Sequence, residues 1–239
     1  MARLLVGQPG FTGKLENYAE RFDMVELRPV DTPLPGPKKL AAWRRKVPPA
    51  FAFSVVLPRA VADLTPGAAL DQALEQAVES ARVLQASCIV LATPATVRPT
   101  ARNRDRIATL AERLPRNGHL LAWHAGGMWE AEDVLATASR GGWLPIFDAA
   151  QEPLAPGPIV YTRIHAVGNA SRLGADRLAL VAERLAGRRD AYVVVDAHVA
   201  AKVKKGLAAI MAGEGRRRAV PALFRPGQPP PDFGEDEEH

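Results

Sequence analysis

The chain has 239 residues, of which 47% are hydrophobic and 24% charged, with a single cysteine. This composition is typical of a globular protein and excludes a collagen, a coiled coil, a disulfide-stapled peptide and a chain disordered throughout. No apolar run approaches the roughly 20 residues of a membrane-spanning helix, and the apolar start before Pro9 is too short for a secretory signal. We therefore expect a cytoplasmic protein with no membrane partner. Cys88, within an apolar run, is interpreted as a small buried hydrophobic residue.

The formal net charge of +5 is unevenly distributed along the sequence. Basic residues cluster at Lys202–Lys205 and Arg216–Arg218, whereas Asp232–Glu238 is acidic. A basic balance suggests nucleic acid as one alternative partner. No aromatic residues interleave with these basic clusters to provide a base-stacking surface.

Short, nearly continuous apolar runs alternate with amphipathic patterns along most of the chain. Such runs are typical of strands that are covered on both faces, which indicates an internal parallel sheet. The sequence predicts eight strands, over Leu4–Val6, Met24–Leu27, Ala52–Leu57, Cys88–Leu91, Leu120–Trp123, Leu144–Phe147, Ile159–Ile164 and Tyr192–Val195.

Helical periodicity occupies the intervals between these runs. The clearest apolar stripe spans Leu70–Leu84 behind a start at Thr65-Pro66. The other predicted helices cover 107–114 with Thr100 as a possible N-cap, 178–185 ended by Gly187, and 203–211 ended by Gly213, with weaker patterns at 15–22, 38–45 and 131–139.

Eight strands separated by helices predict the α/β class and a (β/α)8 TIM-type barrel, with an open doubly wound sheet as the alternative. The segment from Asp148 to Ile159 is too rich in proline for a helix, so the barrel should lack one outer helix between its sixth and seventh strands. Residues 29–37 carry four prolines and predict an extended loop. We expect one domain over 1–224 and a disordered Pro-rich and acidic tail over 225–239.

Two segments resemble motifs of a known family. Tyr18–Leu27 is similar to a helix-to-second-strand motif, followed by Trp43 and Val47–Val55, and Ile159–His165 is similar to a "YVRLHG" strand. These features resemble the YecE-like family, known as domain of unknown function seventy-two, from residue 1 to about 212. The resemblance implies a TIM barrel and no established activity.

Several of the family's motifs are altered in this chain, while four motif positions match. The family's "EFRHPSW" at the fifth strand is replaced by Ala122–Gly126, and its "FNN" at the eighth by Val194–Asp196. The matching positions are Glu26, Arg59, Arg163 and His165. The chain therefore resembles a divergent member with a rebuilt pocket.

The carboxyl ends of barrel strands carry the chemistry in TIM barrels. Residues two apart on a strand share a face, as do Arg163 and His165, and this pairing predicts a polar, arginine-rich mouth suited to a small anionic molecule. The same two-residue spacing relates Glu26 to Arg28 and Asp196 to His198. The predicted ligand-binding residues are Arg59, Arg163, His124, Asp196 and Arg28, and the predicted proton-transfer residues are Glu26 and His165. Hydrolysis and isomerisation of the bound anion are the reactions considered.

Other interpretations of the same residues stay open. Glu26 with Arg163 or Arg59 would also suit a structural ion-pair network, and the altered motifs would suit a non-catalytic scaffold. The basic balance would suit a nucleic-acid-binding or metal-dependent nucleic-acid-processing barrel. No cofactor is predicted, although a divalent metal is an alternative, since zinc and manganese sites use such ligand types. The ligands for it would come from His124, His165, His198, Asp148, Asp196 and Glu26.

Overall fold

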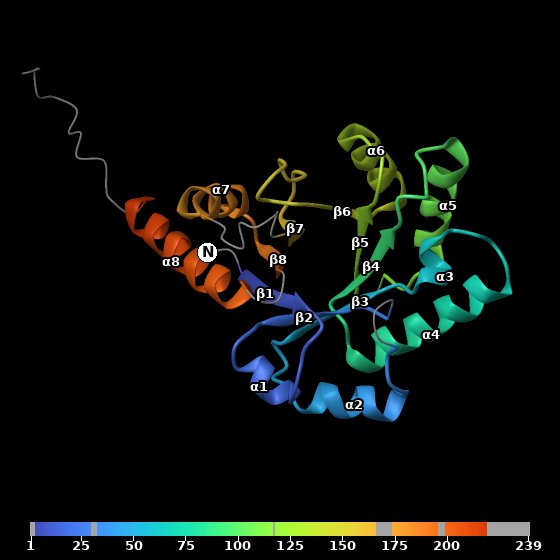
Figure 1. The fold of residues 1–239 in the computed structure, drawn as a ribbon, viewed down its shortest axis with the longest axis horizontal. Coiled ribbons are helices and arrows are strands. Elements are labelled where there is room, and N and C mark those ends of the chain that lie inside the picture. The colour runs from blue at the N-terminus through green and yellow to red at the C-terminus, as the bar shows by residue number, and fades with distance from the viewer. Residues whose placement is uncertain (1–2, 30–32, 117, 166–173, 196–198, 219–239) are drawn as a thin grey trace, which may run out of the picture.

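Eight parallel strands close into a barrel in the order of the chain, from β1 to β8 and back to β1 (Figure 1). The computed structural model describes residues 3–29, 33–116, 118–165, 174–195 and 199–218. Closure through the β1–β8 pair confirms the predicted barrel and excludes the open sheet. The strands are β1 Arg3–Pro9, β2 Met24–Leu27, β3 Ala52–Val56, β4 Cys88–Thr93, β5 Leu120–Ala125, β6 Leu144–Phe147, β7 Ile159–Ile164 and β8 Asp190–Val195.

Helices surround the strands on the outside of the barrel (Figure 1). No helix occurs in the described segment between β6 and β7, as the prolines there predict. The Thr100 hydroxyl caps α5 by accepting a hydrogen bond from the Asn103 amide, which confirms the predicted N-cap. The helices are α1 Leu15–Ala19, α2 Pro37–Arg45, α3 Arg59–Ala62, α4 Ala68–Leu84, α5 Ala101–Glu112, α6 Ala131–Gly141, α7 Ala175–Leu185 and α8 Ala200–Arg218.

Several helix boundaries differ from the prediction, and one short helix was not predicted. The start of α4 lies at Ala68 rather than at Thr65-Pro66, because Gly67 takes a φ of 149° that no helix contains. The prediction that Gly213 ends the last helix is wrong, since α8 continues to Arg218. One glycine inside a helix costs only about 1 kcal/mol, which the turns on either side outweigh. The single-turn helix α3 was not predicted, because four residues are too few to show a periodicity.

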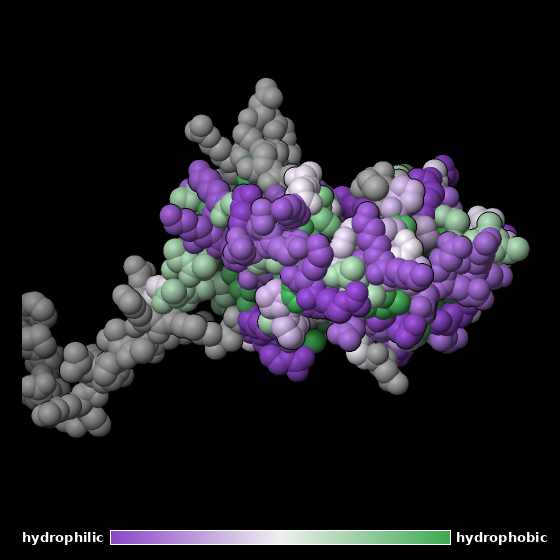
Figure 2. Space-filling view, turned by 90° about the horizontal axis from the view of Figure 1, so that it is seen from below, coloured by the Kyte–Doolittle hydropathy of each residue, from purple (hydrophilic) through white to green (hydrophobic). Residues whose placement is uncertain are grey.

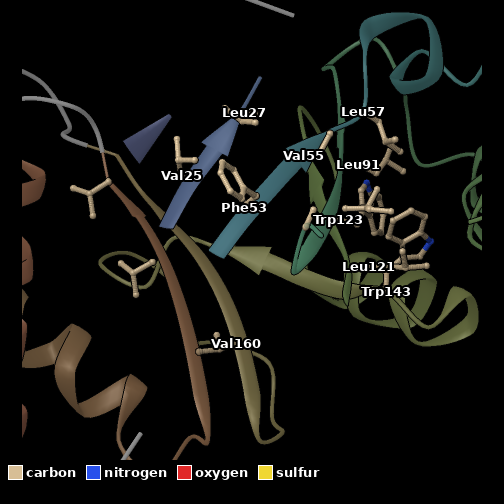
Figure 3. Close-up of a cluster of buried hydrophobic side chains, with 14 of the residues drawn as sticks. Val25, Leu27, Phe53, Val55, Leu57, Leu91, Leu121, Trp123, Trp143 and Val160 are labelled. Carbon is tan, nitrogen blue, oxygen red and sulfur yellow. The ribbon is translucent and has the colours of Figure 1, made fainter. Parts of the chain in front are cut away.

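Two hydrophobic cores lie on opposite faces of the barrel wall. Outward-facing side chains such as Val25 on β2 and Phe53 on β3 (Figure 3) belong to the larger core, which also contains side chains of the helices. The smaller core fills the barrel interior and includes Cys88, whose burial confirms its interpretation as a hydrophobic residue. Inside the barrel the Tyr161 and Tyr192 rings stack with centroids 6.0 Å apart. The interior is therefore a packed core and not an open channel.

Hydrophilic residues predominate on the face shown in Figure 2, where hydrophobic residues are scattered among them. Among the described helices, none is both long and apolar enough to cross a bilayer. The predicted tail over 225–239 lies outside the described residues, so the predicted domain boundary at 224 stays a prediction.

Candidate functional site

The carboxyl ends of β2, β5 and β7 place three polar side chains inside the barrel mouth. Side chains alternate between the two faces of a strand, so each inward position is followed by another two residues later. Glu26 follows the inward-facing Met24 on β2, and Arg163 follows the inward-facing Tyr161 on β7. His124 occupies the equivalent place on β5. The inward-facing residue two positions earlier on each strand therefore belongs to the apolar core, and these three polar side chains lie directly above that core.

Glu26 lies at the centre of a buried hydrogen-bond network. Its carboxylate is fully buried and accepts hydrogen bonds at both oxygens. Arg28 Nε donates to Oε1 at 2.7 Å, while Arg163 donates to Oε2 from Nε at 3.0 Å and from Nη2 at 2.9 Å. The Tyr161 hydroxyl donates to Oε2 at 2.6 Å and lies 2.9 Å from Ser54 Oγ. Residues far apart in the sequence thus meet at one carboxylate.

The charges in this network hold Glu26 ionised. Burial is the largest single effect and would raise the pKa of Glu26, but Arg163, Arg28 and the Tyr161 hydroxyl together lower that pKa below its ordinary value. Burial likewise opposes the charge of Arg163, and Glu26 more than compensates, so the pKa of Arg163 is raised. Two guanidinium groups against one carboxylate leave this part of the mouth with a net positive charge.

A cavity of about 230 Å³, here called the mouth cavity, opens beside Arg163 at the ends of β5, β6 and β7. Arg163 is almost fully buried and reaches the cavity from within the barrel. The polar groups that line the cavity are His124, Asp148, Gln151, Glu152, Arg163 and His165, and the other lining residues are Ala125, Gly127, Trp129, Ala131, Val134, Ile146 and Phe147. The mixture of one cation, two carboxylates and two imidazoles suits a small ligand with both an anionic group and hydroxyl groups.

The two histidines of the mouth cavity have different environments. Their ring centroids are 6.3 Å apart. Burial, helped by the positive charge of Arg163, lowers the pKa of His124 to about 3, so this imidazole stays neutral near pH 7. His165 is exposed, and its backbone N–H donates to Asp148 Oδ2 at 3.2 Å. His124 is thus a hydrogen-bonding group without charge, whereas His165 meets solvent.

Asp148 is held in place by three donors. Its carboxylate accepts hydrogen bonds from the backbone N–H groups of Ala150 and His165 and from the side-chain amide of Gln151. These bonds fold the segment that follows β6 into a turn at the edge of the cavity. The loop that replaces an outer helix therefore shapes the mouth cavity.

The structure does not bring every predicted site residue to the network. Arg59 begins α3 with a side chain 58% exposed, and its Nε donates to Asp63 at 2.7 Å. Neither the mouth cavity nor the Glu26 network includes it. Arg28 bonds Glu26 but lines a different cavity. Asp196 and His198 lie outside the described residues, so their predicted roles are untested.

Two residues of the network were not predicted from the sequence. Tyr161 and Ser54 both lie within apolar runs, where they read as core residues. The alternation of side chains along the strand could have identified Tyr161, because it precedes Arg163 by two residues and must lie on the same face of β7. A buried hydroxyl on that face needs a partner, and Glu26 supplies it.

A metal would need three or more suitable side chains close together. Of the residues that the structure describes, no three histidine, cysteine, aspartate or glutamate side chains are grouped in that way. The divalent-metal alternative also used Asp196 and His198, which this search does not cover. It therefore stays an untested alternative.

Comparisons with known proteins agree on the fold. The family model described as "Protein of unknown function DUF72" matches residues 7–222. No curated protein sequence matches the chain. A crystal structure of a DUF72 family protein from Enterococcus faecalis V583 is 13% identical and superposes with a TM-score of 0.69, covering 90% of this chain and 98% of that chain. A DUF72 family protein from Thermotoga maritima MSB8 is 15% identical, with a TM-score of 0.63 and coverage of 89% and 99%.

Enzymes with barrel folds are also similar in structure. An L-ribulose 3-epimerase is 17% identical and superposes with a TM-score of 0.64, covering 95% of this chain and 100% of that chain. At this level of identity the likeness concerns the fold alone. Activity must be argued from the residues of this chain.

Proposed function

This chain belongs to the protein family of unknown function DUF72, and from the geometry of its barrel mouth we propose that it binds a small anionic molecule in the mouth cavity. Arg163 would be the anchor for the anionic group. A cavity of about 230 Å³ is smaller than the roughly 300–1,000 Å³ typical of sites for drug-sized ligands, so the ligand should have few atoms.

The orientation of Arg163 is the observation that carries this proposal. Its Nε and Nη2 both donate to Glu26, and within the described ranges no hydrogen bond uses Nη1. The guanidinium is therefore fixed before a ligand arrives, with donors in reserve at the cavity. A fixed guanidinium loses little side-chain entropy on binding, and its planar fork matches carboxylate and phosphate oxygens.

In this proposal Glu26 acts as a counter-ion and positioning residue. A carboxylate that accepts four hydrogen bonds, and whose pKa is lowered, is a weak base at neutral pH. Proton transfer would instead fall to His165, which lines the cavity and is exposed, while neutral His124 would hydrogen-bond the ligand. Asp148 and Glu152 would accept from ligand hydroxyl groups.

These residues also suggest a class of reaction. Isomerisation by proton transfer would suit a hydroxylated anion beside an imidazole, and the fold is shared with an L-ribulose 3-epimerase. Any such reaction requires that the anion bind first, and binding can be tested without knowledge of the substrate.

Thermal unfolding in the presence of inorganic phosphate, malonate and glycolate tests the anion site. We expect at least one of them to stabilise the wild type saturably, because a ligand that binds only the folded state raises its stability. The effect should be lost in Arg163→Lys and kept in Arg82→Lys, an exposed α4 arginine paired with Glu79. Each variant is compared with its own anion-free melting temperature. No stabilisation of the wild type, or equal stabilisation of Arg163→Lys, would overturn the proposal.

The alternative nucleic-acid partner gains no support from the described basic cluster. Lys204 Nζ donates to Asp23 at 2.9 Å and to the Arg21 carbonyl at 3.0 Å, so this lysine is already engaged within the chain. Lys202 and Lys205 are exposed. Binding to duplex or single strands at about 50 mM salt, weakening steeply as salt rises, is the result that would favour that alternative.

A further inference from the structure

A second cavity lies between the ends of β1 and β2 and the helix α2, with a volume of about 460 Å³. We call it the aromatic cavity, because Phe11 and Trp43 line it together with Arg28, Leu27 and Leu34. It shares no lining residue with the mouth cavity. We propose that the aromatic cavity is a separate binding site for a small molecule that joins a planar ring to a carboxylate or phosphate group.

Arg28 provides the anchor for the anionic group. Its Nε donates to Glu26 Oε1 at 2.7 Å, and its side chain is only 26% exposed. Neither Nη group of Arg28 makes a hydrogen bond to any residue in the described part of the chain. The guanidinium is thus held at one edge by a buried carboxylate and presents its other donors to the cavity. This arrangement is suited to two parallel hydrogen bonds with an anion.

The wall beside Arg28 is built for a ring. The Phe11 and Trp43 rings meet edge to face, with centroids 5.1 Å apart at 75°. Both rings are only half-buried, so part of each aromatic surface is left for another group. The adjoining Leu27 is buried, and together these apolar surfaces favour a planar ring over a hydrated group.

A second cation lies beside one of the aromatic rings that line the cavity. Lys39 Nζ lies 5.9 Å from the centroid of the Trp43 ring, on the helix that borders the cavity. Among the described residues that line the cavity, none is acidic. The mouth cavity, in contrast, includes two carboxylates. The two cavities therefore favour different ligands: a hydroxylated anion in the mouth cavity and an aromatic acid here.

The volume agrees with such an occupant. A cavity of about 460 Å³ lies within the roughly 300–1,000 Å³ of small-molecule sites. It accommodates a substituted single ring, and an isolated phosphate or acetate would leave the Phe11 and Trp43 surfaces in contact with water. Ring and charge should thus both be needed for tight binding.

Isothermal titration with four probes tests this site: benzoate, phenyl phosphate, benzyl alcohol and acetate. Benzoate or phenyl phosphate should bind saturably, and the tighter of the two identifies the anionic group. Benzyl alcohol, which lacks the charge, and acetate, which lacks the ring, should bind at least about tenfold more weakly. Equal binding of acetate and both aromatic acids, or no saturable binding of either aromatic acid, would overturn the proposal.

Two variants locate the binding in the aromatic cavity. Arg28→Gln and Trp43→Leu should each weaken the aromatic acid by about tenfold or more, whereas Arg45→Gln, on the exposed end of α2, should not. Trp43→Leu leaves the Glu26 network untouched, so it keeps the test valid if Arg28→Gln unfolds. Unchanged affinity in a folded Trp43→Leu protein would refute the site. The Arg163→Lys variant separates this proposal from the mouth cavity, since its loss of phosphate or malonate binding should leave benzoate binding in place.

Discussion

Replacement of Arg163 by methionine is expected to destabilise the protein strongly. The substitution removes two of the four hydrogen bonds to the fully buried Glu26 carboxylate, together with the positive charge that lowers the pKa of Glu26 most. Arg28 and Tyr161 stay in place, but the carboxylate loses the largest of the effects that compensate for its desolvation. Removal of one partner from a buried ion pair costs about 3–5 kcal/mol, so we expect a loss of that size at pH 7.

The pH dependence of this loss identifies its cause. The folded wild type holds the pKa of Glu26 below its ordinary value, so Glu26 stabilises the fold above the unfolded pKa of about 4.3 and loses that effect as pH falls. In Arg163→Met the pKa of Glu26 rises, and protonation then relieves the unpaired charge. The difference in unfolding free energy between the two proteins should therefore shrink on acidification.

The double variant Glu26→Leu with Arg163→Met provides the decisive comparison. It removes both charges, so no buried charge is left without its partner, and Tyr161 retains Ser54 as a hydrogen-bond partner at 2.9 Å. We expect it to be more stable than Arg163→Met alone. Urea unfolding followed by circular dichroism measures all three proteins, with Arg82→Ala as an exposed control expected within about 0.5 kcal/mol of wild type. A double variant that is no more stable than Arg163→Met alone would refute the buried-pair reasoning.

Three further substitutions test other parts of the account. Gly7→Ala should cost about 1–3 kcal/mol, because a Cβ there would lie 2.0 Å from the Met24 carbonyl oxygen, whereas Gly213→Ala meets nothing within 4 Å and should be neutral or stabilising by urea unfolding. Between about pH 6.5 and 4 the unfolded wild type binds a proton at His124 that the folded wild type excludes, so the stability of the wild type falls on acidification. His124→Gln should make this fall less steep, by up to about 1.4 kcal/mol per pH unit. Equal slopes for the two proteins would contradict the lowered pKa of His124. Thr100→Ala should cost about 1 kcal/mol through the lost N-cap of α5, while Thr109→Ala, exposed within the same helix, should not destabilise; equal effects would exclude capping as the cause.

The strands were predictable because a strand that is buried on both faces appears in the sequence as a nearly continuous run of apolar residues. Each of the eight apolar runs overlaps an observed strand, and the short β2 and β6 agree at both ends. The strand β1 is longer than predicted, since Arg3 and the turn-forming Gly7–Pro9 extend it beyond its apolar part. Boundaries set by barrel closure and hydrogen-bond register are not encoded in hydrophobicity alone.

The candidate site was predictable only for residues that lie on a strand or at its end, where the alternation of side chains fixes the face. The spacing of Glu26 with Arg28, and of Arg163 with His165, placed charged groups at the mouth, and the structure joins Glu26 to both arginines. Strand alternation does not predict the position of Arg59, because this residue lies on α3 and not on a strand. A single helical turn after β3 carries it toward Asp63, and such a loop conformation has no periodic signal in the sequence.

Proton–nitrogen NMR of the arginine side chains, followed during titration with phosphate or malonate, tests the proposed anchor most directly. The Nε–H signal of Arg163, assigned through its loss in Arg163→Lys, should move saturably with added anion while the signal of exposed Arg82 stays in place. An Arg163 signal that stays fixed at anion concentrations that stabilise the protein would show that the anion binds elsewhere.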